Sequence, residues 1–303
     1  MHEAILTAKN ITKNYGSTVA LDGVDLTVYK GDILGVIGRN GAGKTTLMKI
    51  ISGISEQSKG EYELYSGEGG SAADHRRRLG CLLDEPAFFR NMTARENLKY
   101  YCLQKGITDH SQIDKVLETV GLGEQKKKKY REFSTGMRQR LGIAFALLDS
   151  PDFVLLDEPI NGLDPIAISD VRETFFRLNR EREVTLMISS HILSDLYTVA
   201  NRFLFLEKGR VIKLLSKEEL NAECSRCTVL RTDDVNRSVT VLEKALSITD
   251  YKVTNKDEMR IFQAGIDPIE ITRCLVQNGI GVASIYDSGV SLEEYFKQII
   301  GPY

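Results

Sequence analysis

The segment from Gly38 to Thr45 constrains this chain more than any other part of it. It reads Gly-Arg-Asn-Gly-Ala-Gly-Lys-Thr, follows the apolar run 33–37 and precedes a helix-like stretch at 46–52. A phosphate-binding loop requires that order of strand, glycine-rich loop and helix. The glycines let backbone N–H groups point inward at the positive end of a helix. Lys44 adds a charge for the terminal phosphates, and Thr45 offers a hydroxyl to Mg²⁺. The segment therefore predicts nucleotide binding.

Length and composition favour a cytoplasmic protein with about two domains. The chain has 303 residues and a formal net charge of -2, which argues against nucleic acid as a partner. Its longest apolar stretch, 141–148, is far shorter than the roughly 20 residues that a membrane-spanning helix needs. The first residues lack the basic and then apolar layout of a signal peptide. The five cysteines are odd in number and scattered, which is typical of reduced thiols.

The hydrophobic pattern of the first half predicts an antiparallel β-subdomain and a helical insert. Val24, Leu26 and Val28 alternate with polar residues, as in a half-buried strand, and 5–12 has the pattern of its neighbour. Three successive helices follow, and they interrupt the alternation of strands and helices. Their predicted ranges are 93–104, 111–120 and 134–148. We expect them to form an insert over about 86–148.

The pattern of buried strands and helices then resumes until Ser216, where the character of the sequence changes. From about Thr228 the chain reads strand, helix, two strands, helix and strand, with a final helix from Leu292. That order is compatible with a small ferredoxin-like α+β domain. We therefore predict a nucleotide-binding domain at 1–215 and an accessory domain at 216–303.

A second part of the active site is predicted where the apolar strand 153–156 ends. This strand delivers Asp157 to the carboxyl edge of a parallel sheet, where ligands bind. Asp157 is expected to hold Mg²⁺, mostly through water, and Glu158 to polarise the attacking water. Two acidic residues can end a strand without any function, but the phosphate loop upstream favours a hydrolytic site.

Five segments in this order resemble the nucleotide-binding subunit of ATP-binding cassette (ABC) transporters over about residues 3–215. They are GRNGAGKT, FSTGMRQRLGIAFAL, FVLLDEP, NGLDP and ISSH. The second is the most discriminating, because ordinary phosphate-loop enzymes have no counterpart to it. The resemblance implies a P-loop NTPase (RecA-like) α/β core in which two subunits sandwich two ATP molecules. Each ATP would lie between the phosphate loop of one subunit and the signature segment of the other.

The resemblance also carries individual roles onto this chain. Ser134 and Gly136 of the signature would face a γ-phosphate at a helix N-terminus, although Ser134 also fits a simple helix cap. Tyr15 matches an aromatic residue that stacks on adenine, and Asp164 matches a loop that links the two sites. His191 matches a histidine that contacts the γ-phosphate and orients water.

The predicted site falls into three groups. The residues expected to contact nucleotide are Tyr15, Gly38, Arg39, Asn40, Gly41, Ala42, Gly43, Lys44, Thr45, Thr46, Ser134, Gly136 and Asp164. The expected catalytic residues are Lys44, Glu158 and His191, and the expected Mg²⁺ ligands are Thr45, Asp84 and Asp157.

Three departures from the family pattern matter, and one of them is Ile160, which stands where threonine or serine is usual. The signature reads Phe-Ser-Thr-Gly-Met at 133–137, where LSGGQ is the commonest form. Similar signatures occur in a branch that resembles antibiotic-immunity and drug-export (ABC-2 type) subunits. Asp84 stands where a glutamine usually binds Mg²⁺ and senses the membrane partner. It is shorter by one methylene and negatively charged, but we still expect it to hold the metal.

The resemblance implies an ATP-hydrolysing subunit that energises an export system through a separate transmembrane permease. The subunit is expected to work as a homodimer or pseudo-dimer, peripheral on the inner face of the cell membrane. The permease would dock at the loop after Asp84 and at 88–97. One alternative is a soluble ATPase of the same family that acts on the ribosome or on nucleic acid. However, translation factors of this family carry two cassettes, and its DNA-repair members insert long coiled coils. A kinase outside the family is disfavoured by the signature segment.

Overall fold

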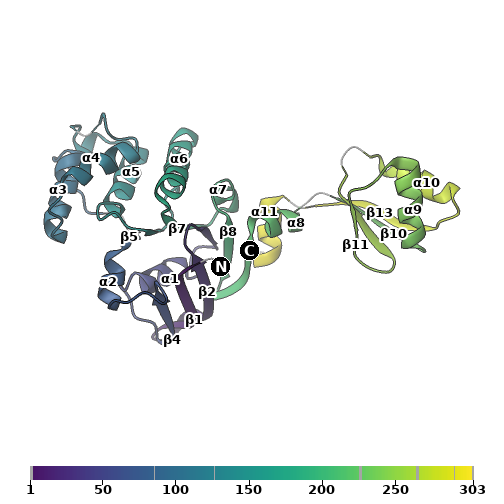
Figure 1. Ribbon diagram of the computed structural model, residues 1–303, viewed down its shortest axis with the longest axis horizontal. Coiled ribbons are helices and arrows are strands. Elements are labelled where there is room, and N and C mark those ends of the chain that lie inside the picture. Colours follow the sequence, from purple (N-terminus) through teal and green to yellow (C-terminus); the bar gives the residue numbers. More distant parts are fainter. Residues whose placement is uncertain are drawn as a thin grey trace. The chain divides into compact units, whose positions relative to one another are not determined.

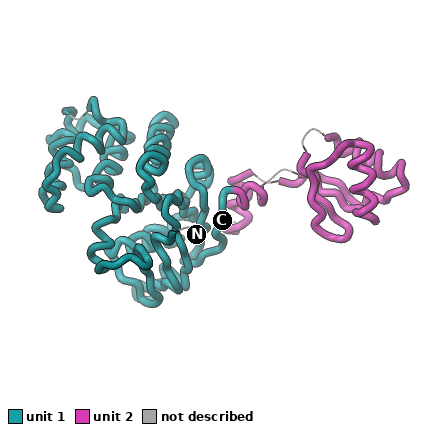
Figure 2. The backbone as a smooth tube through the Cα atoms, in the orientation of Figure 1, with its two compact units in different colours: residues 1–217 teal, residues 218–303 magenta. Residues whose placement is uncertain are grey.

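The computed structural model describes residues 3–84, 86–125, 127–224, 227–263, 266–289 and 291–301. The chain divides into two compact units, Met1–Lys217 and Glu218–Tyr303 (Figure 2). The division falls two residues after the boundary that we predicted. Each unit has its own sheets and helices (Figure 1).

The first unit begins with a three-stranded antiparallel sheet in the order β2-β1-β4. Its strands are β1 (Ala4–Tyr15), β2 (Thr18–Tyr29) and β4 (Lys59–Leu64). Val24, Leu26 and Val28 on β2 are buried, whereas Asp25 between them is exposed, so the alternating pattern is confirmed. This sheet is the antiparallel β-subdomain that we expected.

A six-stranded sheet in the order β5-β6-β7-β3-β8-β9 forms the centre of the first unit. Its strands are β3 (Ile33–Ile37), β5 (Leu79–Leu82), β6 (Phe153–Leu156), β7 (Thr185–Ser190), β8 (Arg202–Glu207) and β9 (Arg210–Ser216). All neighbours are parallel except β8 and β9, which form an antiparallel hairpin. Strand β7 lies between β6 and β3, and this order brings the ends of three strands together.

Helix α1 (Lys44–Ile51) packs between the two sheets of the first unit. Its Leu47 and Met48 are fully buried, in a cluster that also holds Leu6 from β1 and Leu155 from β6. Burying an aliphatic side chain contributes about 1.5–3 kcal/mol. The phosphate loop is therefore anchored at one end by β3 and at the other by a helix that both sheets hold.

The helices of the insert are α3 (Ala94–Lys105), α4 (Ser111–Thr119) and α5 (Thr135–Ala146), with a short 3₁₀ turn at Tyr130–Glu132. They gather on one side of the first unit (Figure 1). Thr93 and Glu96 form a capping box at the start of α3, because each side chain accepts a backbone N–H of the other residue. Helices α6 (Pro165–Arg182) and α7 (Leu193–Tyr197) follow the insert.

Helix α2 (Ala72–Arg77) was not predicted from the sequence. Ser71 and Asp74 form a capping box at its start, but none of its residues is buried. Without a buried face the helix leaves no apolar period in the sequence. The short helix α8 (Lys217–Cys224) was missed in the same way, since Leu220 is its only buried residue.

The second unit contains a four-stranded antiparallel sheet in the order β11-β12-β10-β13. After α8, the strands and helices of this unit are, in chain order, β10 (Cys227–Thr232), α9 (Val235–Leu246), β11 (Tyr251–Val253), β12 (Glu258–Ile261), α10 (Pro268–Gln277), β13 (Val282–Ser288) and α11 (Leu292–Ile300). The run from β10 to β13 has the β-α-β-β-α-β order of a ferredoxin-like unit. Leu230, Met259, Ile271 and Leu275 belong to a core of its own.

In the part of the chain that the structure describes, no helix has both the length and the apolar character needed to cross a membrane.

Candidate nucleotide site

The phosphate loop borders a hollow of about 210 Å³ between the end of β3 and the start of α1. The hollow is lined by Ala20, Arg39, Asn40, Gly41, Ala42, Gly43, Lys44, Thr45, Thr46 and Glu158. Eight consecutive residues predicted to contact nucleotide therefore meet Glu158 in one place. Gly38 lies just before them, where a Cβ atom would be 2.4 Å from the carbonyl oxygen of Leu206 on β8. Only glycine fits at that approach.

Lys44 is almost fully buried, at 5% exposure, and its ammonium group has three oxygen neighbours. It donates to the carbonyl oxygens of Gly38 at 2.7 Å and Arg39 at 3.2 Å. The third neighbour is Glu158 Oε1, at 3.1 Å. The buried charge of Lys44 is therefore stabilised jointly by carbonyl oxygens of the phosphate loop and by the carboxylate of Glu158, the predicted base.

Asp157 follows β6, and both of its carboxylate oxygens accept hydroxyl protons. Thr45 Oγ1 donates to Asp157 Oδ2 at 2.5 Å. The hydroxyl of Ser189, on β7, donates to Asp157 Oδ1. The structure therefore joins two of the predicted Mg²⁺ ligands, Thr45 and Asp157, in direct contact. It also adds Ser189, to which the sequence analysis assigned no role.

Glu158 lies next to Asp157 in the left-handed backbone region, with φ of 49°. Its N–H donates to Ser189 Oγ at 2.8 Å. Its carboxylate reaches His191 on the other side, with 2.9 Å between Oε2 and Nδ1. Two of the three predicted catalytic side chains are therefore in hydrogen-bond contact, and the third, Lys44, lies 3.1 Å from the remaining carboxylate oxygen of Glu158.

The segment after His191 is anchored to helix α6 by Arg172. This side chain donates to the carbonyl oxygens of Asp195 at 3.0 Å and Ser194 at 3.2 Å. The Asp195 carboxylate lies 3.7 Å from the same guanidinium, and burial raises the pKa of its carboxyl group. These contacts hold the first turn of α7 and so restrict where His191 can lie.

Ser134 and Gly136 of the signature lie at the start of α5, and Asp164 lies at the start of α6. Ser134 caps α5 by accepting the N–H of Met137 at 3.3 Å, and Asp164 caps α6 by accepting from Ala167 at 2.9 Å. A Cβ at Gly136 would lie 2.8 Å from the Cβ of Ala167, so glycine allows α5 to pack against α6. Ser134, Gly136 and Asp164 do not line the hollow at the phosphate loop of their own chain.

Tyr15 and Asp84, two more of the predicted residues, do not line the hollow at the phosphate loop either. Tyr15 is 51% exposed, with the ammonium of Lys13 4.9 Å from its ring centre, and it does not line the hollow. The Asp84 carboxylate forms an ion pair with Lys49 at 3.2 Å, and its side chain is 75% exposed. It lines a second hollow, of about 300 Å³, with Asp157 and Glu158. The roles of Tyr15 and Asp84 stay predictions.

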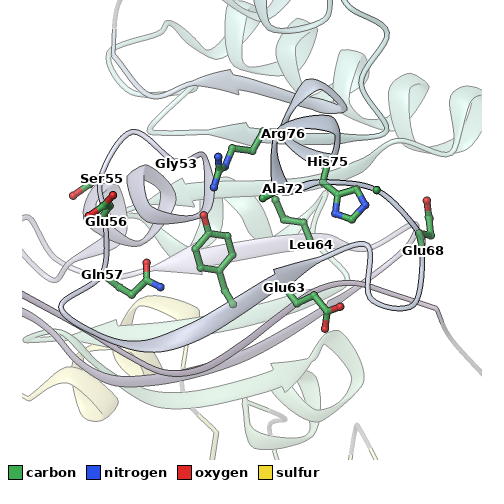
Figure 3. A pocket seen from close by; sticks show the side chains of 12 residues that line it. Gly53, Ser55, Glu56, Gln57, Glu63, Leu64, Glu68, Ala72, His75 and Arg76 are labelled. Carbon is green, nitrogen blue, oxygen red and sulfur yellow. The ribbon is translucent and has the colours of Figure 1, made fainter.

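A larger hollow, of about 650 Å³, lies away from the phosphate loop (Figure 3). It lies where the loop after α1, strand β4 and helix α2 meet, and Glu63, His75 and Arg76 are among its lining residues (Figure 3). None of the residues predicted to contact nucleotide lines it. The larger hollow therefore lacks the predicted nucleotide-binding residues, whereas the smaller hollow at Lys44 contains them.

Comparisons with known proteins show the family of this chain. A family model described as ABC transporter matches residues 21–161. The bacitracin transport ATP-binding protein BcrA of Bacillus licheniformis is 38% identical over 299 residues, which cover 98% of this chain and 97% of the relative. The lantibiotic transport ATP-binding protein SrtF of Streptococcus pyogenes is 40% identical over 214 residues, covering 71% and 91% of the two chains.

A solved structure gives the same result for the fold. The ADP conformation of an ATP-binding cassette of an ABC transporter superposes with a TM-score of 0.64 at 26% identity, covering 73% of this chain and 94% of that one. The predicted P-loop fold and the predicted resemblance to antibiotic-transport ATPases are confirmed. The chain belongs to the ATP-binding proteins of ABC transporters.

Proposed function

We propose that this chain is the ATP-hydrolysing subunit of an export system of the antibiotic-transport type, working through a separate permease. The observation that carries the proposal is that five predicted residues meet at one place. Lys44 and His191 flank the Glu158 carboxylate, and Asp157 lies next to it on the hydroxyl of Thr45. The names of the relatives, bacitracin transport and lantibiotic transport, support the class of cargo.

Lys44 and the loop N–H groups would bind the phosphates of ATP, and Glu158 would accept a proton from the attacking water. His191 would orient the γ-phosphate and the Glu158 carboxylate together. The oxygens of Thr45 and Asp157 are the hard ligands that Mg²⁺ prefers, and Mg²⁺ commonly takes only one or two of these from the protein. These residues fit the metal, which would neutralise charge on the phosphates when bound. Among the described residues, His, Cys, Asp and Glu form no cluster of three that would hold a metal without nucleotide.

Two copies of the cassette are needed in this proposal, whether as a homodimer or a pseudo-dimer. Ser134 and Gly136 lie outside the phosphate-loop hollow of their own chain, so the signature of one copy would cover the ATP of the other. The N-terminal end of α5, with Ser134 at its cap, suits an anionic phosphate there.

The permease would dock on the insert. Phe89 and Tyr100 are each 42% exposed, and their ring centres lie 4.9 Å apart. Leu103 on the same helix α3 is 64% exposed. Such a group of exposed apolar side chains marks an interaction surface. Docking on a permease would hold the chain on the inner face of the cell membrane.

Co-purification tests this proposal against action on the ribosome or on nucleic acid. The chain is produced in its source cells with an affinity tag, and the purified complex is assayed for ATP hydrolysis and for bound macromolecules. We expect hydrolysis and a membrane protein. Ribosomes or DNA in place of a membrane protein would refute the transport proposal, and so would an absence of hydrolysis. A Leu103→Glu variant should lose the membrane protein while its isolated ATPase activity persists.

A further inference from the structure

We propose that Ser189 is a positioning residue for hydrolysis, whose hydroxyl holds Asp157 and Glu158 in their working orientations. The inference rests on the proposed function. Ser189 is fully buried on β7, and its hydroxyl makes one hydrogen bond to each of these two residues.

The polarity of these two bonds is defined by the groups themselves. A serine hydroxyl has one proton to donate, and a backbone N–H can only donate. The Glu158 N–H donates to Ser189 Oγ at 2.8 Å, and the Ser189 hydroxyl donates to Asp157 Oδ1. The single hydroxyl therefore connects the base's backbone to the carboxylate of the predicted metal ligand.

Strand register explains why Ser189 reaches both groups. In the parallel pair of β6 and β7, Leu156 lies beside Ile188. Asp157 follows Leu156 in the chain, and Ser189 follows Ile188. On the other side of β7, Ser190 lies beside Ile37, the last residue of β3 before the phosphate loop. Ser189 is thus at the centre of the edge where the catalytic segments meet.

The backbone of Glu158 gives this contact its importance. With φ of 49°, Glu158 is in the left-handed region, which is strained for a residue with a Cβ. Ser189 accepts the N–H at that strained position and so favours it over a relaxed one. The strained conformation directs the carboxylate between Lys44 and His191.

Ser189 also fixes Asp157 in a way that Thr45 does not. Thr45 holds Asp157 Oδ2, but Thr45 is itself a predicted Mg²⁺ ligand in the phosphate loop. Ser189 belongs to the sheet and has no such second task. Mutation of a residue that hydrogen-bonds to a metal ligand without binding the metal typically lowers metal affinity or activity about 10–100-fold.

A matched control comes from the opposite end of the same strand. Thr185 is also fully buried on β7, and its hydroxyl accepts the N–H of Gly31 at 3.0 Å. Thr185→Val removes a buried hydrogen bond from β7 without touching Asp157 or Glu158. Variants at Ser189 and Thr185 should therefore both weaken β7, but only those at Ser189 should disturb the positions of Asp157 and Glu158.

The test uses the full chain with Ser189→Ala, Ser189→Cys and Thr185→Val. Turnover and KM are measured for ATP hydrolysis, and the binding of a fluorescent ATP analogue is titrated with and without Mg²⁺. We expect kcat of Ser189→Ala to fall about 10–100-fold. Its affinity for the analogue without Mg²⁺ should stay at the parental value, while the gain in affinity from Mg²⁺ shrinks. Thr185→Val should keep both the parental kcat and the parental gain.

Several results would overturn the proposal. One is that Ser189→Ala keeps the parental kcat and the parental increase in analogue affinity on adding Mg²⁺. Another is that Thr185→Val loses as much of both quantities as Ser189→Ala does. Ser189→Cys keeps the shape of the side chain with a weak donor, so a parental kcat there refutes the proposal even if Ser189→Ala does not fold. If the parental chain hydrolyses no ATP, the proposed function fails, and the binding titration alone still decides the role of Ser189.

Discussion

Replacing Glu158 by glutamine should slow hydrolysis and tighten ATP binding at the same time. The first effect follows from the loss of a base, which typically contributes about 10²–10⁴-fold to the rate. The second follows from an ion pair within the site, in which Glu158 Oε1 lies 3.1 Å from Lys44 Nζ. ATP must compete with this carboxylate for Lys44, and glutamine removes the competing charge while keeping the shape.

The ion pair sets the size of the second effect. Two unit charges 3.1 Å apart attract by about 5 kcal/mol at an effective dielectric constant of 20. Desolvation of Lys44 and the partial exposure of Glu158 reduce the net value to about 1–2 kcal/mol. Because 1.4 kcal/mol is a factor of ten, we expect Glu158→Gln to bind ATP about tenfold more tightly.

Titration calorimetry in the absence of turnover measures this affinity, and phosphate release measures the rate. Glu158→Asp is the control, because it keeps the negative charge but shortens the side chain. It should also turn over slowly, yet its ATP affinity should stay closer to the parental value than that of Glu158→Gln. Weaker binding of ATP by Glu158→Gln would refute the competition for Lys44. A parental rate of hydrolysis would refute Glu158 as the base.

Two further predictions concern the insert and the departure at position 84. Gly136→Ala should destabilise the first unit by about 1–3 kcal/mol, because the new Cβ would lie 2.8 Å from that of Ala167. Adding Ala167→Gly should recover part of the loss in urea unfolding, and a double variant no more stable than Gly136→Ala would contradict the clash. Asp84→Gln should change folding stability by less than about 1 kcal/mol, since its pair with Lys49 is exposed. It should nevertheless shift the Mg²⁺ dependence of hydrolysis, and an unaltered Mg²⁺ titration would leave Asp84 as a partner of Lys49 only.

Features that depend on neighbouring residues in the sequence were predictable. The phosphate loop needs a strand before it and a helix after it, and all three elements are contiguous. The cap of α3 at Thr93 and the proline start of α6 at Pro165 are likewise local. The β-α-β-β-α-β order of the second unit could be read because each of its longer elements has its own apolar period.

Features that depend on strand order could not be read in this way. Ser189 and Ser190 are adjacent in the ISSH segment, and nothing local separates their roles. Only the insertion of β7 between β6 and β3 places Ser189 beside Asp157. Ser190 instead accepts the N–H of Ile192 at 3.0 Å. The pairing of Asp84 with Lys49 is equally non-local, because it joins the end of β5 to helix α1.

Two glycines of the phosphate loop are required for different physical reasons, close packing at Gly38 and backbone conformation at Gly41. A Cβ at Gly38 would lie 2.4 Å from the backbone oxygen of Leu206, so this position excludes any side chain whatever its backbone conformation. Gly41 has no atom within 4 Å of such a Cβ, but its φ is +81°. That conformation costs alanine about 1–2 kcal/mol, and asparagine tolerates it better.

Urea unfolding without nucleotide should therefore rank the variants differently at the two positions. Gly41→Asn should be more stable than Gly41→Ala, because asparagine relieves a conformational cost. Gly38→Asn should be no more stable than Gly38→Ala, because a larger side chain cannot relieve a clash with the backbone of β8. The same rank order at both positions, with asparagine above alanine, would show that close approach to Leu206 is not what requires Gly38.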